Sequence, residues 1–354
     1  MPDVSVAIPV LDGGALFADV LRALASQTVA HELIICDSGS RDGSLALARE
    51  SGARVIEIAP ESFSHGGTRN LLVQSATGAR VALLTQDAVP ADERWLERLL
   101  GGFALAPDVA IVYGPYRPRP QASPAVRIEL KSWFDSLAPD GAAQVERLDE
   151  RERVSLAAVE LIGRRGFFTD ANACIDRAAW QRVPFRRVPY AEDRVLAIDM
   201  LRAGYAKAYV PEAAVVHSHA YTPTQQLRRC FDEWRGLRQV YGWREPAAPR
   251  HVLSRLRGAL GQARVALSAE AAPRARRAAV LRQVLAHQLV CLCGALLGSR
   301  AERLPSALRG AISLEGHASF AALALDPRES VRASGEGLGS ASASAEWPAD
   351  GPRR

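Results

Sequence analysis

The chain has 354 residues, of which 48% are hydrophobic and 23% are charged. This composition excludes a disordered protein, because it provides enough apolar residues for the core of one large domain or two modest ones. The formal net charge is +5, and the basic residues, mostly arginines, cluster between Arg228 and Arg309. This balance favours an anionic partner, either phosphate groups or an acidic membrane surface, and we expect no nucleic-acid binding.

The cysteines are scattered along the chain at Cys36, Cys174, Cys230, Cys291 and Cys293. The first predicted strand follows the initial methionine almost at once, so we expect no targeting peptide, and free thiols in a reducing cytoplasm. The last two cysteines are one residue apart, which is the wrong spacing for a zinc knuckle.

The first quarter of the chain alternates between strand and helix patterns. Apolar and β-branched runs predict strands at 4–10, 32–36 and 54–58. Apolar residues that recur on one face predict helices at 16–27, 45–50 and 71–76. This alternation is typical of βαβ units, in which helices cover a mostly parallel sheet.

A further apolar run at 81–84 predicts a buried central strand, after which Asp87 emerges. Ligands of open parallel α/β sheets bind outside the carboxyl ends of the strands, where Asp87 and, after the second strand, Asp37 are expected. Two ordinary structural interpretations stay open. Asp87 could be a turn or N-cap residue before a helix at 92–103, and Asp37 could close an Asx turn with the Ser-Gly-Ser that follows it.

Two common phosphate-binding motifs are missing from the sequence. No G-x-G-x-x-G follows the first strand, and no G-x-x-x-x-G-K-[ST] occurs. Dinucleotide-dependent redox chemistry and P-loop phosphoryl transfer are therefore disfavoured. The strand-terminal carboxylates remain: one can accept a hydrogen bond from a nucleobase N–H, and one near a diphosphate can hold a hard divalent cation.

The segment 63–70, Phe-Ser-His-Gly-Gly-Thr-Arg-Asn, predicts a loop that leads into a helix at Leu71. Backbone N–H groups at a helix N-terminus favour anions, and the glycines permit a close approach. Arg69 could therefore contact a phosphate or a sugar. In the alternative, Gly66 and Gly67 only make a turn, and Arg69 is a solvated helix residue.

The middle of the chain predicts a strand at 109–113 and then a proline-rich segment that leaves the sheet. A helix ending near Trp133 and Phe134 is followed by a charged stretch at 146–153, which we expect to be exposed. A flexible insert at this place would suit a gate over a binding site, but the composition favours a plain surface loop.

A strand at 166–175 then enters a short helix at 177–181. Asp170 and Asn172, which lie in this strand, offer polar side chains that can bind hydroxyl groups.

Glu192 and Asp193 stand just before a predicted helix at 195–202. Carboxylates at this position commonly cap a helix and complement its dipole. The alternative is that one of them is a general base, which takes the proton of an attacking hydroxyl group.

His217 and His219 follow a strand at 206–210 and lie in an extended segment. Side chains alternate along such a segment, so we expect both imidazoles to point to the same side. The pair could bind a cation or a diphosphate, or could be ordinary polar residues at a strand end. Arg228 and Arg229, on the next helix, are close enough in sequence to add phosphate contacts.

Beyond about residue 244, Ala-, Leu- and Arg-rich patterns predict helices at 252–267 and 278–297. The longest uncharged run, 283–299, is at the lower limit for crossing a bilayer, so we predict a packed or interfacial helix whose arginines meet anionic lipid. From about residue 326, Gly, Ser, Ala, Pro and charged residues dominate, and this tail is predicted to be disordered.

Several segments, spread over roughly residues 4 to 240, resemble family 2 glycosyltransferases of the GT-A fold. They are Val6-Ala7-Ile8-Pro9-Val10, Gln27-Thr28, the run from Ile34 to Ser44, and Leu84-Thr85-Gln86-Asp87-Ala88. Three segments resemble, more narrowly, the bacterial rhamnosyltransferase branch of this family, which builds cell-surface polysaccharide. They are 63–70, Thr85-Gln86-Asp87-Ala88 and His217-Ser218-His219-Ala220-Tyr221-Thr222.

This resemblance implies an α/β fold with a GT-A-like, mostly parallel sheet between layers of helices, followed by a C-terminal helical extension. A glycosyltransferase domain is expected at 1–244, with a nucleotide-sugar half up to about residue 115 and an acceptor half after it. A helical region is expected at 245–325, and the disordered tail at 326–354.

The resemblance also implies roles for single residues. Asp37 would contact the nucleotide base. Asp87 would be the metal-binding last position of the D-x-D motif, which has Thr85 at its first position here. His217, or else His219, would complete a site for Mg²⁺ or Mn²⁺. A single carboxylate can suffice, since Mg²⁺ usually takes one or two carboxylates plus substrate phosphates.

By the same resemblance, Asp193 would be the base of an inverting displacement, with Glu192 in support. The other residues expected to bind the nucleotide or donor are Pro9, Ser38, His65, Gly66, Thr68, Arg69, Gln86 and Arg228. The residues expected to bind the acceptor are Asp170 and Asn172.

The expected function is transfer of rhamnose or a related deoxyhexose from a nucleoside diphosphate donor to a hydroxyl of a cell-surface polysaccharide or lipid-linked acceptor. We expect a cytoplasmic enzyme whose basic C-terminal helices contact the inner face of the cell membrane. Two alternatives stay open: a catalytically silent nucleotide-sugar-binding module, which the joint presence of the four carboxylates disfavours, and a nucleotidyltransferase on a similar fold. The second would have a basic phosphate loop after the first strand, and 10–14 carries no basic residue.

Overall fold

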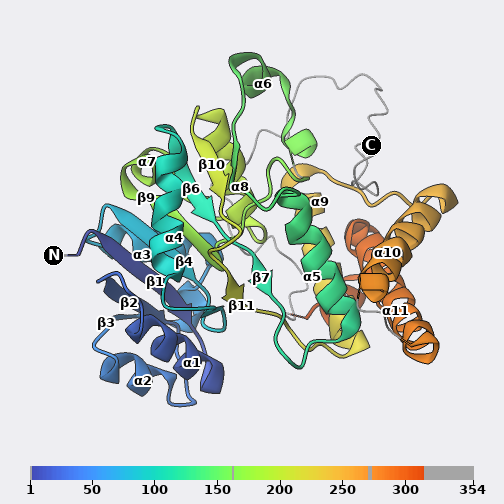
Figure 1. The fold of residues 1–354 in the computed structure, drawn as a ribbon, viewed down its shortest axis with the longest axis horizontal. Helices are drawn as coiled ribbons and strands as arrows, with labels where there is room; N and C mark the ends of the chain where they lie inside the picture. Colours follow the sequence, from blue (N-terminus) through green and yellow to red (C-terminus); the bar gives the residue numbers. More distant parts are fainter. Residues whose placement is uncertain (1, 162, 270–272, 315–354) are drawn as a thin grey trace.

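The computed structural model describes residues 2–161, 163–269 and 273–314. At its centre lies an eight-stranded sheet (Figure 1). Its strands, in the order in which they lie side by side, are β3 (Arg54–Glu57), β2 (Glu32–Asp37), β1 (Val4–Val10), β4 (Arg80–Leu84), β9 (Asn172–Asp176), β6 (Val109–Tyr113), β10 (Ala206–Tyr209) and β8 (Gln144–Glu146). The first four are parallel, as are β6 and β10, whereas β9 and β8 run antiparallel to their neighbours.

Two layers of helices cover the sheet, because successive side chains of each strand point to opposite faces. Val6 and Ile8 of β1 pack in one layer with Phe17, while Ala7 packs in the other with Leu72. The first layer contains α1 (Gly14–Ala25), α2 (Ser44–Glu50) and α4 (Trp95–Gly101). The second contains α3 (His65–Ser75), α5 (Pro124–Leu137), α7 (Arg177–Arg182) and α8 (Glu192–Arg202).

A small second sheet lies at the end of β4. It consists of β5 (Val89–Pro90), β11 (Val215–Val216) and β7 (Tyr116–Arg117), with β11 in the middle. Val215 lies opposite both Pro90 and Tyr116. This sheet therefore joins three segments that are far apart in the sequence, one after β4, one after β6 and one after β10.

Two segments that the sequence predicts to be loops form strands or helices instead. The charged stretch 146–153 was expected to be an exposed loop, but β8 pairs with β10 at the sheet edge. It is followed by α6 (Glu150–Ser155), which Asp149 and Glu152 cap reciprocally. Here the capping box and the edge pairing outweigh the loop-like composition.

The loop predicted at 63–70 is also wrong, because α3 begins at His65. Gly66 and Gly67 have a low helix propensity, but they meet a packing need that propensity does not show. A Cβ atom on Gly66 would lie 2.2 Å from the backbone carbonyl oxygen of Arg186, so no larger residue fits there.

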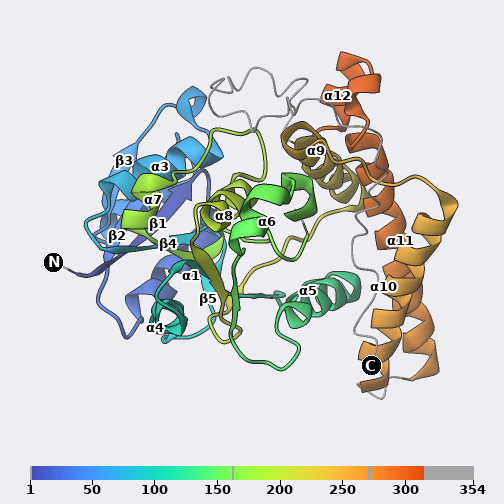
Figure 2. The same ribbon diagram turned by 90° about the horizontal axis from the view of Figure 1, so that it is seen from above.

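In the described part of the chain, four α-helices follow β11 and form the C-terminal extension (Figure 2). They are α9 (Pro223–Tyr241), α10 (Pro249–Ala269), α11 (Arg274–Gly298) and α12 (Ser306–Ile312). Figures 1 and 2 show α10 and α11 at the end of the molecule farthest from β1, β2 and β3. Short 3-10 helices complete the described elements at Pro60–Ser62, Gly102–Leu105, Ala158–Leu161 and Ala301–Arg303.

The backbones of α9 and α11 approach each other closely. A Cβ atom on Gly294 would lie 2.5 Å from the carbonyl oxygen of Leu227, and one on Gly298 would lie 2.2 Å from that of Phe231. By length and mean hydropathy (1.6), α11 could cross a membrane, but it packs here against α9, α10 and α5. The tail predicted to be disordered lies outside the described residues.

Candidate active site

Asp87, His217 and His219 meet beside the small sheet. Asp87 lies two residues before β5 and His217 directly follows β11, so the pairing of these strands brings the residues together. Oδ2 of Asp87 is 3.4 Å from Nδ1 of His217 and 3.9 Å from Nδ1 of His219. The centroids of the two imidazoles are 4.8 Å apart. The prediction that both histidines point to the same side is confirmed.

This group has the composition of a divalent-cation site. Its possible ligand atoms, one from each residue, all lie within 4.8 Å of one another. Among the described residues, the buried Nδ1 of His217 has no hydrogen-bond partner, although a carboxylate oxygen of Asp87 is 3.4 Å away. A cation between these atoms would satisfy both, and the residues therefore fit one.

The electrostatics of the group suit metal ligands. Burial lowers the pKa of His217 to about 4 and also lowers the pKa of His219, so both imidazoles are neutral near pH 7. Burial on its own would raise the pKa of Asp87, but the contacts with His217 and His219, a hydrogen bond from Thr85 and the charge of Arg119 outweigh it and hold this pKa below its usual range. The group is thus an ionised carboxylate beside two neutral imidazoles.

Arg119 belongs to this site but was not predicted from the sequence. Its guanidinium donates hydrogen bonds to the backbone carbonyls of Asp87 and Ser218 and lies 3.4 Å from Oδ2 of Asp87. Its backbone N–H donates to Oγ of Ser218 at 3.0 Å. In the sequence, Arg119 stands between two prolines, which indicate only that the chain leaves the sheet. The pairing of β7 with β11 brings it to Asp87.

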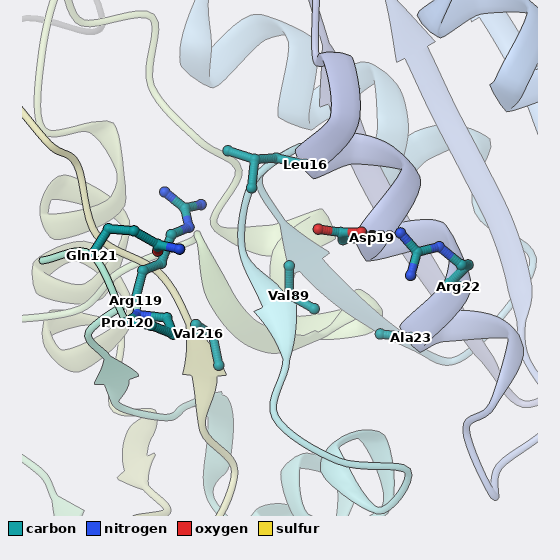
Figure 3. A pocket seen from close by; sticks show the side chains of 9 residues that line it. All are labelled: Leu16, Asp19, Arg22, Ala23, Val89, Arg119, Pro120, Gln121 and Val216. Carbon is teal, nitrogen blue, oxygen red and sulfur yellow. Dashed lines mark hydrogen bonds and ion pairs between the residues drawn. The ribbon is translucent and has the colours of Figure 1, made fainter.

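Arg119 also lines an open groove of about 600 Å³ between α1 and the small sheet (Figure 3). The residues around the groove are Leu16, Asp19, Arg22, Ala23, Val89, Arg119, Pro120, Gln121 and Val216. Figure 3 shows Asp19 and Arg22 on α1, across the groove from Arg119. Through Arg119, the groove adjoins the cation-competent group.

A second group of charged side chains joins α3, the segment before β9, and the start of α8. Arg69 pairs with Asp170 and donates from Nη2 to Oδ1 at 2.7 Å. Only 3% of Arg69 and 6% of Asp170 are exposed. The buried Glu192 and the half-buried Asp193 lie beside them, in the first turn of α8.

The carboxyl groups of Asp170, Glu192 and Asp193 lie around a single arginine, Arg69. Their closeness to one another raises the pKa values of Glu192 and Asp193. Burial, followed by the charge of Asp170, raises the pKa of Glu192 to about 8. Burial, followed by the charges of Asp170 and Glu192, raises the pKa of Asp193 well above its ordinary range. A carboxylate whose pKa lies near the working pH is a better proton acceptor once it is ionised.

Ala191, directly before these two acids, has a left-handed backbone with φ of 59° and ψ of 34°. For a residue other than glycine, this conformation costs on the order of 1 kcal/mol. Ala191 is buried in a cluster with Cys230 and Trp234 of α9, whose packing compensates for the cost. Because α8 begins immediately after Ala191, this strained residue sets the direction in which both acids point.

At the carboxyl end of β2, Asp37 uses its two oxygens differently. Oδ1 accepts hydrogen bonds from the backbone N–H groups of Gly39 (2.9 Å) and Ser40 (3.0 Å), which is the Asx turn of the alternative interpretation. Oδ2 is buried and has no hydrogen-bond partner among the described residues. The turn therefore leaves one acceptor atom available, and the predicted nucleobase contact stays a prediction.

Other residues predicted to bind the donor lie nearby. Oγ of Ser38 donates to the carbonyl of Val10 at 3.1 Å, and Pro9 is half-buried in β1. The amide of Gln86 donates to the carbonyl of Leu11 (2.9 Å) and accepts from the N–H of Leu11 (2.7 Å). Gln86 thus ties the loop that carries Asp87 to the loop after β1.

In the segment predicted as an anion-binding loop, His65 faces the carboxylates. Its side chain is 46% exposed, and Nδ1 lies 3.8 Å from Oε1 of Glu192. Gly66 and Thr68 are buried inside α3. Arg69 is buried and paired with Asp170 and lies in α3, not in a loop, and its predicted contact with a phosphate or sugar stays a prediction.

Asn172 is also placed differently from the prediction. It is fully buried, and its amide donates to the carbonyls of Ala213 (2.8 Å) and Pro115 (3.1 Å). Its Oδ1 accepts from Nε1 of Trp95 at 2.8 Å. With these contacts Asn172 is a structural link between segments, and the predicted sugar contact is wrong for this residue.

On α9, the two predicted phosphate-binding arginines differ in their surroundings. Arg228 is half-buried. The guanidinium of Arg229 lies over the ring of Tyr190, 5.0 Å from its centroid, close to the start of α8. The structure thus places Arg229 at the carboxylate end of the site.

Known proteins resemble this chain both in sequence and in fold. The family model of glycosyl transferase family 2 matches residues 5–141. The chain is 33% identical over 233 residues to the O-antigen chain rhamnosyltransferase RfbN of Salmonella typhimurium, covering 65% of this chain and 70% of RfbN. It is 31% identical over 238 residues to the O-antigen chain rhamnosyltransferase WbaN of Salmonella anatum, covering 66% of this chain and 71% of WbaN.

Among solved structures, the chain is similar to the mannosyltransferase PcManGT from Pyrobaculum calidifontis in complex with GDP-Man and Mn²⁺. The TM-score is 0.53 at 19% identity, and the match covers 84% of this chain and 87% of PcManGT. This likeness confirms the predicted GT-A fold, and the sequence matches confirm the predicted enzyme class. The chain belongs to glycosyl transferase family 2.

Proposed function

We propose that this glycosyltransferase moves rhamnose, or a related deoxyhexose, from a nucleoside diphosphate donor to a hydroxyl of a cell-surface polysaccharide or lipid-linked acceptor. The observation that carries the proposal is the placement of a cation-competent group close to a cluster of buried carboxylates. The ring of Tyr116 touches His217, and its hydroxyl hydrogen-bonds Thr169, the residue before Asp170. The names of the two Salmonella relatives support the donor sugar and the class of acceptor.

The donor would lie across the carboxyl ends of β1, β2 and β4. The free Oδ2 of Asp37 would accept a hydrogen bond from the nucleobase. Asp87, His217 and His219 would hold the cation, and the two imidazoles suit Mn²⁺ better than Mg²⁺, which prefers oxygen ligands. When bound, the cation would neutralise the charge that develops on the departing diphosphate.

The acceptor hydroxyl would be deprotonated by Asp193. Asp193 is more exposed than Glu192, so it is the member of the pair that an acceptor can reach. Glu192 and the Arg69–Asp170 pair would hold it in place, and burial together with the charges of Asp170 and Glu192 would raise its basicity. A single displacement by the acceptor oxygen inverts the anomeric carbon, and no covalent nucleophile is needed.

We further propose that the C-terminal extension touches an anionic membrane surface. Exposed on α10 and α11 are basic side chains, Arg257, Arg264, Arg274 and Arg282, and large apolar ones, Leu253, Val265, Leu289 and Leu297. Arg255, also on α10, is not part of this exposed set, because it pairs with the buried Glu245 and lies over the ring of Trp234. The remaining arginines and apolar residues together suit the lipid interface.

The decisive experiment supplies Mn²⁺ and a panel of nucleotide sugars that includes deoxythymidine-diphosphate rhamnose, with and without lipid extracts as acceptor. Release of the nucleoside diphosphate and transfer of label to the lipid fraction are measured. We expect acceptor-dependent release with the deoxyhexose donor. Release that is greatest with a hexose donor would refute the sugar assignment, and binding without any turnover would favour the silent module.

A further inference from the structure

We propose that Arg119 makes cation binding depend on the donor's diphosphate. The inference rests on the proposed cation site and concerns a residue that the sequence did not single out. It begins from the charges around Asp87. Among the described residues, the basic atoms of Arg119, His217 and His219 lie 3.4, 3.4 and 3.9 Å from Oδ2 of Asp87. The group that could hold a cation contains a single acid, Asp87.

The charge count of this group is unusual for a metal site. Imidazoles must be neutral to bind a metal, so they add no negative charge. The guanidinium of Arg119 offsets the single charge of Asp87, and Thr85 stands where a D-x-D motif would supply a second carboxylate. A divalent cation alone would therefore enter a group with a net charge of about zero and would be repelled by a fixed guanidinium a few ångströms away.

A nucleoside diphosphate changes this balance. Its phosphate oxygens offer Arg119 better partners than Asp87 does, because arginine pairs with phosphate through two parallel hydrogen bonds. The contact of Arg119 with Oδ2 of Asp87, at 3.4 Å, is long for a charge-assisted hydrogen bond. With the diphosphate present, Arg119 binds phosphate and Asp87 becomes available to the metal ion. The added negative charge then stabilises both the guanidinium and the metal ion.

The placement of Arg119 makes this exchange possible. Its backbone N–H and guanidinium hold Ser218, between the two histidines, and its guanidinium also holds the carbonyl of Asp87. The side chain is therefore anchored at the boundary between the cation group and the open groove of Figure 3. A short movement of the guanidinium exchanges one anionic partner for another without disturbing β5 or β11.

The test measures Mn²⁺ binding, without turnover, by electron paramagnetic resonance of free Mn²⁺. The protein is titrated with Mn²⁺ alone and with Mn²⁺ in the presence of dTDP, UDP or GDP. In the wild type, we expect at least one of these diphosphates to tighten Mn²⁺ binding about tenfold or more. Arg119→Gln should bind Mn²⁺ alone about tenfold more tightly, and the diphosphate should then add little.

Two variants separate charge from structure. Arg119→Lys keeps the positive charge, so Mn²⁺ alone should bind as weakly as in the wild type. The diphosphate should still tighten Mn²⁺ binding, but less strongly, because lysine cannot form two parallel hydrogen bonds with a phosphate. Arg22→Gln removes an exposed arginine of the same groove, one that pairs with Asp19, and should leave every constant unchanged. Circular dichroism melting of each variant checks the fold.

Three results would overturn the inference. They are weaker or unchanged binding of Mn²⁺ alone by Arg119→Gln, loss of the coupling in Arg119→Lys, and independent binding of Mn²⁺ and diphosphate in the wild type. Failure of the proposed function looks different, because Mn²⁺ binding would then persist in Asp87→Asn.

Discussion

The ring of Tyr116 packs edge-on against the imidazole of His217, with the two centroids 4.8 Å apart. Tyr116 lies in β7 and His217 directly after β11, and these strands are parallel neighbours in the small sheet. Because the hydroxyl of Tyr116 bonds to Thr169, one side chain spans the distance between the cation-competent group and the buried carboxylates. Tyr116 therefore links two groups that consist of different residues, and each group can be tested with its own variant.

Asp87→Asn should abolish turnover and leave thermal melting nearly unchanged. The amide keeps the shape of the side chain but loses the charge that would hold the cation and offset Arg119. Nucleoside diphosphate release is the assay, and Asp19→Asn, on the far wall of the groove, is the matched control. Full activity of Asp87→Asn, or of the wild type in excess chelator, would remove Asp87 from this role.

Asp193→Asn should lower kcat by about 10²–10⁴-fold, the usual contribution of a general base, and leave the affinity for the donor near that of the wild type. Glu192→Gln should be milder, since Glu192 acts through its neighbours. Donor affinity is measured by calorimetry and kcat by product formation. If Glu192→Gln were the more damaging change, the two roles would be exchanged, and two active variants would leave both acids as helix caps.

Arg69→Met should destabilise the protein by about 3 kcal/mol or more, because the carboxylate of Asp170 would stay buried without its partner. Arg22→Met, which breaks an exposed pair whose arginine side chain is 75% accessible, should cost well under about 1 kcal/mol. Urea unfolding followed by circular dichroism compares the two. Equal small costs would show that Asp170 readily finds another partner or a proton.

The raised pKa of Glu192 predicts how stability changes with pH. The folded protein holds this proton up to about pH 8, whereas the unfolded chain releases it near the ordinary value of 4.5. Between these values the folded state binds more protons, so stability must fall as pH rises. Glu192→Gln removes this loss and should gain up to about 5 kcal/mol over the wild type by pH 8, with little difference at pH 4. Chemical unfolding across this range measures it, and a constant difference would contradict the assignment.

Membrane contact is tested by sedimentation with liposomes. The wild type should pellet with anionic vesicles at low salt and be released by high salt, since each basic residue near such a surface contributes on the order of 1 kcal/mol. Replacing Arg257, Arg264 and Arg282 by Gln should reduce binding to the vesicles. Arg255→Gln should mainly lower the stability of the folded protein. Binding that ignores lipid charge and salt would refute the proposed contact and leave the enzyme class untouched.

Local patterns predicted much of the main sheet. The strands β1 and β6 match their predicted bounds, because buried strands are continuous apolar runs between clear turn signals. The convergence of His217 and His219 followed from the alternation of side chains in an extended segment. The position of Asp87 beyond the end of β4 followed from the same run of apolar residues.

The contacts that sequence could not predict are long-range. Arg69 and Asp170 are 101 positions apart, and nothing in either segment indicates the other. Arg119 reaches Asp87 only through the pairing of β7 with β11, a pair of two-residue strands too short to leave a periodic pattern. The glycines at the start of α3 indicated a turn, whereas Gly66 serves a close backbone contact that only the folded structure reveals.

The close contact of α9 with α11 has a practical consequence for anyone who wishes to shorten the protein. A chain cut after Tyr241 would retain α9 but expose Cys230 and Trp234, which are buried together with Cys291 and Ala295 of α11. The same cluster includes Ala191, so the cut would also loosen the support of the strained residue before α8. A truncated product of this kind would expose an apolar surface to water and aggregate. The shortest soluble form of the enzyme must therefore extend through Gly298.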